Sequence, residues 1–297
     1  MRVLLIGLGD IARKAYLPLL SRRADLEIHL ATRDPVVLDD VGGSFRLPHR
    51  YASAGEALRH ATFDAAFVHA ATDAHAELVR LLVEHGIPTF VDKPLADNLG
   101  EVEALVALAR RRATPLGIGF NRRFAPDYVA LRGTGANLLM MEKHRHGQPD
   151  LPRRVVFDDF IHVVDTLLFL APSPVRRRTI ETQVIDGMLH AIVLTLAGDG
   201  FTAVGSMHRA SGIDEERLDV IGGNVRRSVL NLADRLDASG TQSLHRRPDW
   251  VPLGRQRGFE AMCDDFLRAA RERRPVDEAA ILATHELCEA IVRHAEG

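Results

Sequence analysis

Short runs of apolar residues alternate with longer amphipathic segments over the first 120 residues. Five runs are typical of strands buried on both faces, and they lie at residues 3–6, 26–31, 65–69, 89–91 and 116–120. Segments rich in alanine and leucine have apolar residues at helical spacing, at residues 54–60, 74–85 and 98–112. This alternation predicts βαβ units and a doubly wound parallel sheet, the α/β fold class, for a domain over residues 1–120.

The pattern changes after residue 121. A helix-like stretch at 126–131, a strand at 137–143 and an apolar helix at about 153–170 come first. Four strand-like runs then follow without long helices between them, which favours antiparallel pairing; they lie at 179–185, 189–196, 202–208 and 216–221. With helices at 258–272 and 276–294, residues 121–297 are predicted to form a smaller C-terminal α+β domain with a mainly antiparallel open sheet. Residues 222–254 give no clear pattern.

Composition narrows the class of protein. A chain of 297 residues with 46% hydrophobic content can bury two cores. Its 38 Lys+Arg and 40 Asp+Glu leave a formal charge of −2, which favours a small-molecule partner over nucleic acid or a membrane surface. Two cysteines are too few for a disulfide framework, and no secretory leader or long apolar run is evident. We therefore expect a cytoplasmic protein.

A glycine motif follows the first apolar run directly. Gly7, Gly9 and Ala12 match G-x-G-x-x-A, with Asp10 and Ile11 between them, at the point where the first strand leads into the first helix. In this motif the first glycine permits the tight turn, the second lets the backbone approach a pyrophosphate, and the small third residue allows close packing. The motif predicts a dinucleotide-binding Rossmann domain, and a purely structural tight turn is the alternative.

The end of the second strand bears on the choice of dinucleotide. An acidic residue at this place usually holds the ribose hydroxyls of NAD, whereas this chain has Thr32 and Arg33, followed by Asp34. A hydroxyl and a guanidinium suit a 2′-phosphate. The sequence therefore favours NADP(H), with NAD(H) possible because Asp34 could reach a ribose. A surface arginine without a ligand is the other interpretation.

Further motifs resemble one enzyme family. Asp92, Lys93 and Pro94 follow the strand at 89–91, Thr72 and His75 follow the strand at 65–69, and the runs 119–126, 141–145 and 158–165 extend the similarity. Together they resemble the Gfo/Idh/MocA oxidoreductases, within them the MviM-like subgroup, although aspartate at 92 replaces the usual glutamate. Besides the glycine turn and the Thr32–Arg33 pair, the resemblance implies cofactor contacts at Ala71, Thr72, His75, Asp92, Lys93, Pro94, Asn121 and Arg122.

The resemblance makes Lys93 the catalytic lysine. Its place at the carboxyl end of a parallel strand agrees, since ligands bind at that edge of such sheets, and a desolvated lysine can titrate in a useful range. Lysine is rare here, because the only others are Lys14 and Lys143. An ordinary surface lysine is the alternative. The Lys93–Pro94 bond is also a candidate for a cis peptide.

Asp158, His162 and Asp165 form a second group of candidates. Spacings of four and three residues predict that they share one face of an otherwise apolar helix. The resemblance implies that Asp158 and His162 lie beside Lys93 over the nicotinamide, with His162 as general acid/base and Asp158 orienting it or binding substrate. The alternative is a set of helix caps and core hydrogen bonds, which is as strong as the functional interpretation for Asp159 and Asp165.

For several other polar residues, the functional interpretation is weaker. Asn121 and Arg122 are interpreted as substrate or nicotinamide contacts, or as part of an interdomain salt bridge. Lys143, His144 and His208 could line the floor of a substrate cleft or be structural. No metal site is expected, because His144 and His146 are two apart and no further ligand motif completes a set.

The function that these features predict is reversible hydride transfer between nicotinamide and a hydroxyl- or carbonyl-bearing carbon of a small polyol, sugar or cyclitol-like substrate. The resemblance also implies a homo-oligomer. Two other hypotheses stay open: a dinucleotide-sensing regulatory protein without turnover, and an NAD-dependent lyase or hydrolase that oxidises its substrate only transiently.

Overall fold

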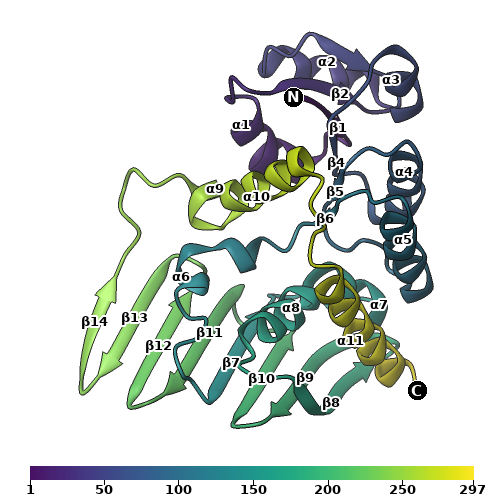
Figure 1. The fold of residues 1–297 in the computed structure, drawn as a ribbon. Coiled ribbons are helices and arrows are strands. Elements are labelled where there is room, and N and C mark those ends of the chain that lie inside the picture. Colours follow the sequence, from purple (N-terminus) through teal and green to yellow (C-terminus); the bar gives the residue numbers. More distant parts are fainter. The chain divides into compact units, whose positions relative to one another are not determined.

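The chain folds into two units, each built on one β-sheet, and the computed structural model describes all 297 residues (Figure 1). Unit 1 comprises Met1–Gly119 and Phe259–Leu282, and unit 2 comprises Phe120–Gly258 and Ala283–Gly297. None of the helices combines the length and the apolar character that crossing a bilayer requires.

The sheet of unit 1 has six parallel strands in the order β3-β2-β1-β4-β5-β6, which is the Rossmann order. Its strands are β1 (Arg2–Ile6), β2 (Glu27–Ala31), β3 (His49–Tyr51), β4 (Ala65–Val68), β5 (Thr89–Val91) and β6 (Leu116–Ile118). Its helical segments are η1 (Ala12–Tyr16), α1 (Leu17–Leu20), α2 (Pro35–Ser44), α3 (Ala54–His60), α4 (Thr72–Glu84), α5 (Leu99–Arg111) and α10 (Phe259–Glu272).

Helices cover both faces of this sheet, with α4 and α5 on one side and α1 and α10 on the other (Figure 1). Phe266 of α10 packs against Phe67 of β4 and Phe90 of β5, with ring centroids 5.3 and 5.4 Å apart. The sequence pattern predicts that residues 259–282 belong to the second domain, whereas in the structure they are part of unit 1. Phe266 instead completes the aromatic core of unit 1.

The sheet of unit 2 has eight strands in the order β14-β13-β12-β11-β7-β10-β9-β8, antiparallel except for the β7–β10 pair. Its strands are β7 (Leu138–His144), β8 (Val175–Ile185), β9 (Met188–Gly198), β10 (Phe201–His208), β11 (Glu215–Gly222), β12 (Val225–Leu230), β13 (Asp234–Ser239) and β14 (Thr241–His245). Its helical segments are η2 (Asn121–Phe124), α6 (Pro126–Val129), α7 (Pro152–Val155), η3 (Val156–Phe160), α8 (Ile161–Leu170) and α9 (Leu253–Gln256), and α11 (Glu278–Glu296) begins in unit 1 and ends in unit 2.

The predicted fold class is confirmed, with a parallel Rossmann sheet followed by a mainly antiparallel one. Unit 2 is not the smaller part, because three strands that the pattern did not reveal extend its sheet. These strands, β12 to β14, lie in the stretch without a clear pattern. Helix α8 packs on β7 and β10, so the segment that carries Asp158 and His162 rests on the middle of this sheet.

Candidate functional site

The glycine turn joins β1 to a helical segment in unit 1. Gly7 has φ +84°, and a Cβ added there would lie 2.5 Å from the backbone nitrogen of Ala70. Only glycine fits this conformation and this approach to β4. Over Gly9 the space is open, since a Cβ there would meet no atom within 4 Å. A turn that is closed on the β4 side and open above Gly9 fits a pyrophosphate held by main-chain amides.

The helix that leaves the turn begins with exposed residues and quickly becomes buried. Asp10 is exposed and pairs with Lys14 at 2.8 Å, whereas Ala12 is fully buried. The next turn, η1, is π-helical, and such turns are frequent at functional sites. The buried Ala12 fits the close packing that the third position of the motif requires, and the first turn leaves its backbone N–H groups for a ligand.

At the end of β2 the three candidate polar residues have different surroundings. The Asp34 carboxylate caps α2, because its Oδ1 accepts hydrogen bonds from the backbone N–H groups of Val36 and Val37 at 2.9 and 3.2 Å. Thr32 is half-buried and Arg33 is exposed, with no ion pair to another residue. One oxygen of the Asp34 carboxylate thus caps its helix, while the exposed Arg33 guanidinium makes no ion pair.

The residues around Lys93 lie at the ends of β4 and β5. His75 is buried, and its Nδ1 and Nε2 lie 2.7 Å from the Pro94 carbonyl oxygen and 2.9 Å from the Ala70 carbonyl oxygen. His75 therefore links the two strand ends through backbone groups, whereas Ala71 is exposed and Thr72 half-buried at the start of α4. Lys93 is half-buried, and the Lys93–Pro94 peptide bond is cis, as the sequence suggested.

Two buried aromatic rings that the sequence did not single out, Tyr16 and His69, lie near Asp92. Burial raises the pKa of Asp92, whose Oδ1 accepts a hydrogen bond from the Tyr16 hydroxyl at 3.4 Å. Tyr16 stacks on His69 with ring centroids 3.9 Å apart. Burial lowers the pKa of His69 to about 3, and neither of its ring nitrogens has a hydrogen-bond partner. His69 is therefore a neutral ring within the core of unit 1.

In unit 2, the helix that carries Asp158 and His162 does not keep a regular geometry. Residues 156–160 form the π-helical turn η3 between α7 and α8. Asp158 is exposed and His162 half-buried, whereas Asp165 is fully buried. Asp165 accepts hydrogen bonds from Arg123 at 2.7 and 2.9 Å and from Thr284 at 3.2 Å. Asp158 lies within the π-helical turn, whereas His162 and Asp165 are three residues apart within α8. Asp165 is thus held in the core by Arg123 and Thr284.

A cluster of cations surrounds Asp159. Lys143, Arg145 and Arg209 place nitrogens 2.9, 2.7 and 2.7 Å from its carboxylate oxygens. Burial alone would raise the pKa of Asp159, but the field of Lys143 and Arg145 outweighs it and holds the pKa below its usual range. Asp159 is thus a fixed anion that anchors η3 to strand β7.

A second carboxylate, Glu216, lies on the same strand pair. Glu216 and Lys143 are register partners on β11 and β7, and Arg122 donates to both Glu216 oxygens, at 2.9 and 2.5 Å. Burial lowers the pKa of Lys143 to about 8. Asn121 donates to the Arg257 carbonyl oxygen at 2.8 Å. Arg122 therefore makes a salt bridge within unit 2, in place of the interdomain bridge considered from the sequence.

Sequence reasoning missed Glu216 and treated Lys143 as weak, although a signal was present. Along β7, Lys143 follows Leu139 and Met141 in period-two alternation, and on β11 Glu216 precedes Leu218 in the same way. A charged residue on the buried face of a strand requires a partner. His144 and His208 have local roles, since the Nδ1 of each accepts a hydrogen bond from a backbone N–H at 3.1 Å.

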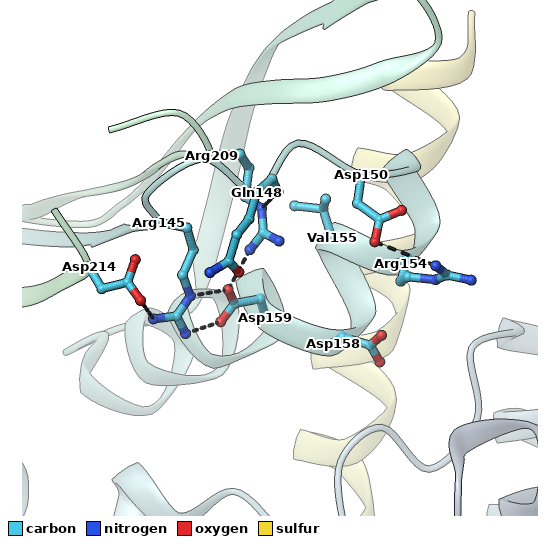
Figure 2. A pocket seen from close by; sticks show the side chains of 9 residues that line it. All are labelled: Arg145, Gln148, Asp150, Arg154, Val155, Asp158, Asp159, Arg209 and Asp214. Carbon is cyan, nitrogen blue, oxygen red and sulfur yellow. Dashed lines mark hydrogen bonds and ion pairs between the residues drawn. The ribbon is translucent and has the colours of Figure 1, made fainter. Parts of the chain in front are cut away.

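An open pocket of about 330 Å³ lies beside Asp158 and Asp159 in unit 2 (Figure 2). The two carboxylates point to different sides, with Asp159 held by Arg145 and Arg209 and Asp158 turned away from them (Figure 2). The lining is mostly charged and combines arginines with aspartates: Arg145, Gln148, Asp150, Arg154, Val155, Asp158, Asp159, Arg209 and Asp214. Guanidinium donors and carboxylate acceptors in one small pocket suit a ligand rich in hydroxyl groups.

In a comparison with known proteins, both parts of the chain match family models. Residues 1–120 match the model of the Gfo/Idh/MocA family, described as an oxidoreductase family with an NAD-binding Rossmann fold. Residues 126–237 match the model of the YceM-like C-terminal domain.

Individual relatives agree with this assignment. The protein YceM of Salmonella typhimurium is 35% identical over 310 residues, covering 99% of this chain and 98% of the relative. The myo-inositol dehydrogenase Hyg17 of Streptomyces leeuwenhoekii is 36% identical, over 64% of this chain and 62% of the relative. Among solved structures, the MviM dehydrogenase of Clostridium difficile superposes with a TM-score of 0.93 at 28% identity, covering 99% of both chains. The chain therefore belongs to the Gfo/Idh/MocA family of oxidoreductases.

Proposed function

We propose that the chain is an NAD(P)-dependent dehydrogenase or reductase that acts on a hydroxyl- or carbonyl-bearing carbon of a small polyol, sugar or cyclitol, with NADP(H) favoured over NAD(H). The observation that carries the proposal is the glycine turn of unit 1. A backbone φ of +84° requires glycine at position 7, and the space over Gly9 is open. A bound nicotinamide would accept or donate the hydride. The protein residues bind, orient and handle the proton.

The proposed roles differ between the two units. In unit 1, the amides of the glycine turn hold the pyrophosphate, and Thr32 with Arg33 recognises a 2′-phosphate. Lys93 hydrogen-bonds the reacting oxygen, and His75 positions it through the Pro94 carbonyl contact at 2.7 Å. In unit 2, His162 is the general acid/base and Asp158 contacts substrate at the pocket that it lines.

Two observations support the substrate class. The pocket beside Asp158 has a volume of about 330 Å³, at the small end of the range for ligand sites, and its lining offers donors and acceptors for several hydroxyl groups. In addition, Hyg17, which covers about two thirds of this chain, is a myo-inositol dehydrogenase. We therefore place inositols and simple sugars first among candidate substrates.

The test is a turnover screen of inositols and sugars with NAD⁺ and NADP⁺, followed by the absorbance of reduced nicotinamide. Lys93→Ala should lower turnover by roughly 10²- to 10⁴-fold and leave dinucleotide binding almost unchanged, since its interaction belongs to the transition state. Lys14→Ala is the matched control, because Lys14 is exposed and pairs only with Asp10. Unchanged turnover in Lys93→Ala would remove Lys93 from the mechanism.

The cofactor preference is tested separately by fluorescence titration of NADPH and NADH. The parent should bind NADPH more tightly, and Arg33→Ala should lose that preference, because the guanidinium is exposed and free of ion pairs. Arg59→Ala, another exposed arginine of unit 1, should retain it. Tighter NADH binding by the parent would overturn the NADP assignment while leaving the dehydrogenase proposal intact.

A further inference from the structure

Three side chains with metal-ligating atoms come together on one face of the sheet of unit 1. Glu27 and His29 are two residues apart on β2 and therefore point to the same face, and His49 on β3 is the register partner of His29. The Nε2 atom of His29 lies 2.8 Å from Oε1 of Glu27, and Nε2 of His49 lies 3.9 Å from the same oxygen. The three ligand atoms all lie within 4.8 Å of one another.

The environment of His29 is that of a metal ligand. The ring is buried, and its Nε2 atom faces the Glu27 carboxylate. Its Nδ1 lies 3.2 Å from the Tyr51 hydroxyl. A ligating histidine is usually held in this way through its second nitrogen. Phe63 packs edge-on at 5.1 Å and fixes the ring plane.

The other two ligands leave room for an ion to enter and adjust the geometry. His49 and Glu27 are exposed, with side-chain exposures of 45% and 46%. Tetrahedral zinc with bonds near 2.0 Å separates its ligand atoms by about 3.3 Å, between the 2.8 and 3.9 Å seen here. The His49 ring stacks on the His29 ring, with centroids 4.2 Å apart and planes 11° apart, so the exposed His49 side chain has to turn out of this stack to direct its Nε2 atom to a shared ion. Arg2, whose Nε lies 3.3 Å from Glu27, is a competing cation, but it is half-exposed and can turn away.

We propose that Glu27, His29 and His49 form a binding site for a divalent transition-metal ion of the zinc type. Two imidazoles and one carboxylate favour such an ion over Mg²⁺ or Ca²⁺, which prefer oxygen ligands alone. The site ties the three-residue edge strand β3 to β2. It shares no residue with the candidates for cofactor or substrate. Sequence spacing does not reveal this site, because the register of β2 and β3 brings His29 and His49 together.

The experiment uses the untagged full-length protein after treatment with a chelator, near neutral pH. Titration with Zn²⁺ alone by calorimetry should show one ion per chain with micromolar or tighter affinity, and thermal unfolding should shift to higher temperature with added Zn²⁺. His49→Ala should weaken binding at least about tenfold. Because His49 is exposed on an edge strand, this variant should fold, and circular dichroism checks that it does.

His85→Ala is the matched control, since His85 is exposed at the end of α4 and contacts only the Leu81 carbonyl oxygen. It should bind Zn²⁺ as the parent does, and Glu27→Gln should weaken binding like His49→Ala. Zn²⁺ affinity in the millimolar range, or equal affinity in His49→Ala and the parent, would overturn the proposal. Dinucleotide binding is measured on the same samples, so failure of the metal site is distinguished from failure of the proposed dehydrogenase function.

Discussion

The two units present their candidate site residues by different physical means. In unit 1, main-chain groups dominate: Gly7 makes the turn, Asp34 caps backbone N–H groups, and His75 binds two carbonyl oxygens. In unit 2, side-chain charges dominate, since Asp159 and Glu216 are each shared by more than one cation. A change in unit 1 should therefore have a local and graded effect. Removal of a partner from one of these carboxylates in unit 2 leaves a buried charge poorly compensated, which is more costly.

The largest effect on stability is expected from Arg122→Met. This variant leaves Glu216 buried without its bidentate partner, and the free energy of unfolding should fall by about 3–5 kcal/mol, measured by urea denaturation. Adding Glu216→Leu should recover part of the loss, because no isolated charge then remains. Arg177→Met, at an exposed arginine of β8, is the control and should stay within about 0.5 kcal/mol of the parent. A loss below about 1 kcal/mol in Arg122→Met would contradict the comparison.

Lowering the pH should test the contribution of the buried charges of unit 2 to stability without a mutation. Burial alone would raise the pKa of Glu216, but Arg122, Lys143 and Tyr128 outweigh it and lower the pKa from 4.5 to about 2. A group whose folded pKa is depressed stabilises the protein above its unfolded pKa, and this contribution is lost as the pH falls through the folded pKa. The loss, about 3 kcal/mol, should occur between about pH 4.5 and pH 2. Denaturation curves over this range should be less pH-dependent in Glu216→Gln, and an identical slope would refute the assignment.

Alanine substitutions at Gly7 and Gly9 test the candidate dinucleotide site of unit 1, which consists mainly of backbone groups. Gly7→Ala should cost about 2–3 kcal/mol, because a Cβ would lie 2.5 Å from Ala70 at φ +84°, and it should abolish dinucleotide binding. Gly9→Ala has open space and should fold like the parent, yet bind dinucleotide more weakly, since the Cβ would occupy the place proposed for the pyrophosphate. Thermal unfolding and fluorescence titration separate the two effects. Undiminished NADPH binding in Gly9→Ala would argue against a pyrophosphate at this turn.

The smallest effect is expected at the cap of α2. Asp34→Ala removes the acceptor of two backbone hydrogen bonds and should cost about 1 kcal/mol. Asp34→Asn, which preserves a capping oxygen, should be nearly neutral. Neither variant should change the preference between NADPH and NADH if Arg33 sets it. A change of preference in Asp34→Asn would assign the ribose contact to Asp34 after all.

Features with a local signal were predictable from the sequence. The buried apolar runs gave five of the six parallel strands, and the glycines at 7 and 9 located the turn between β1 and the first helix. The missing strand, β3, is a three-residue edge strand, His49–Tyr51, whose side chains are polar or aromatic and largely exposed. Nothing in its pattern distinguishes it from a loop.

Features that depend on pairing between distant segments were not predictable. Strands β13 and β14 are polar, and β14 is exposed throughout, so they lack the alternation that marks a half-buried strand. Lys143 and Glu216 each occupy a buried-face position in their strand, but only the β7–β11 register makes them partners. Likewise, helical periodicity predicts one regular helix for Asp158, His162 and Asp165, because the π-helical turn at Val156–Phe160 leaves no clear mark in the sequence.

The path of the chain limits how the protein can be divided. The backbone passes between the units after residues 119, 258 and 282, so unit 1 is discontinuous in sequence. A fragment that stops at Gly119 would leave Phe67 and Phe90 without the ring of Phe266, exposing apolar surface that favours aggregation. Producing the dinucleotide-binding half alone would instead require a linker that splices residue 119 to residue 259, so that the late helix is retained.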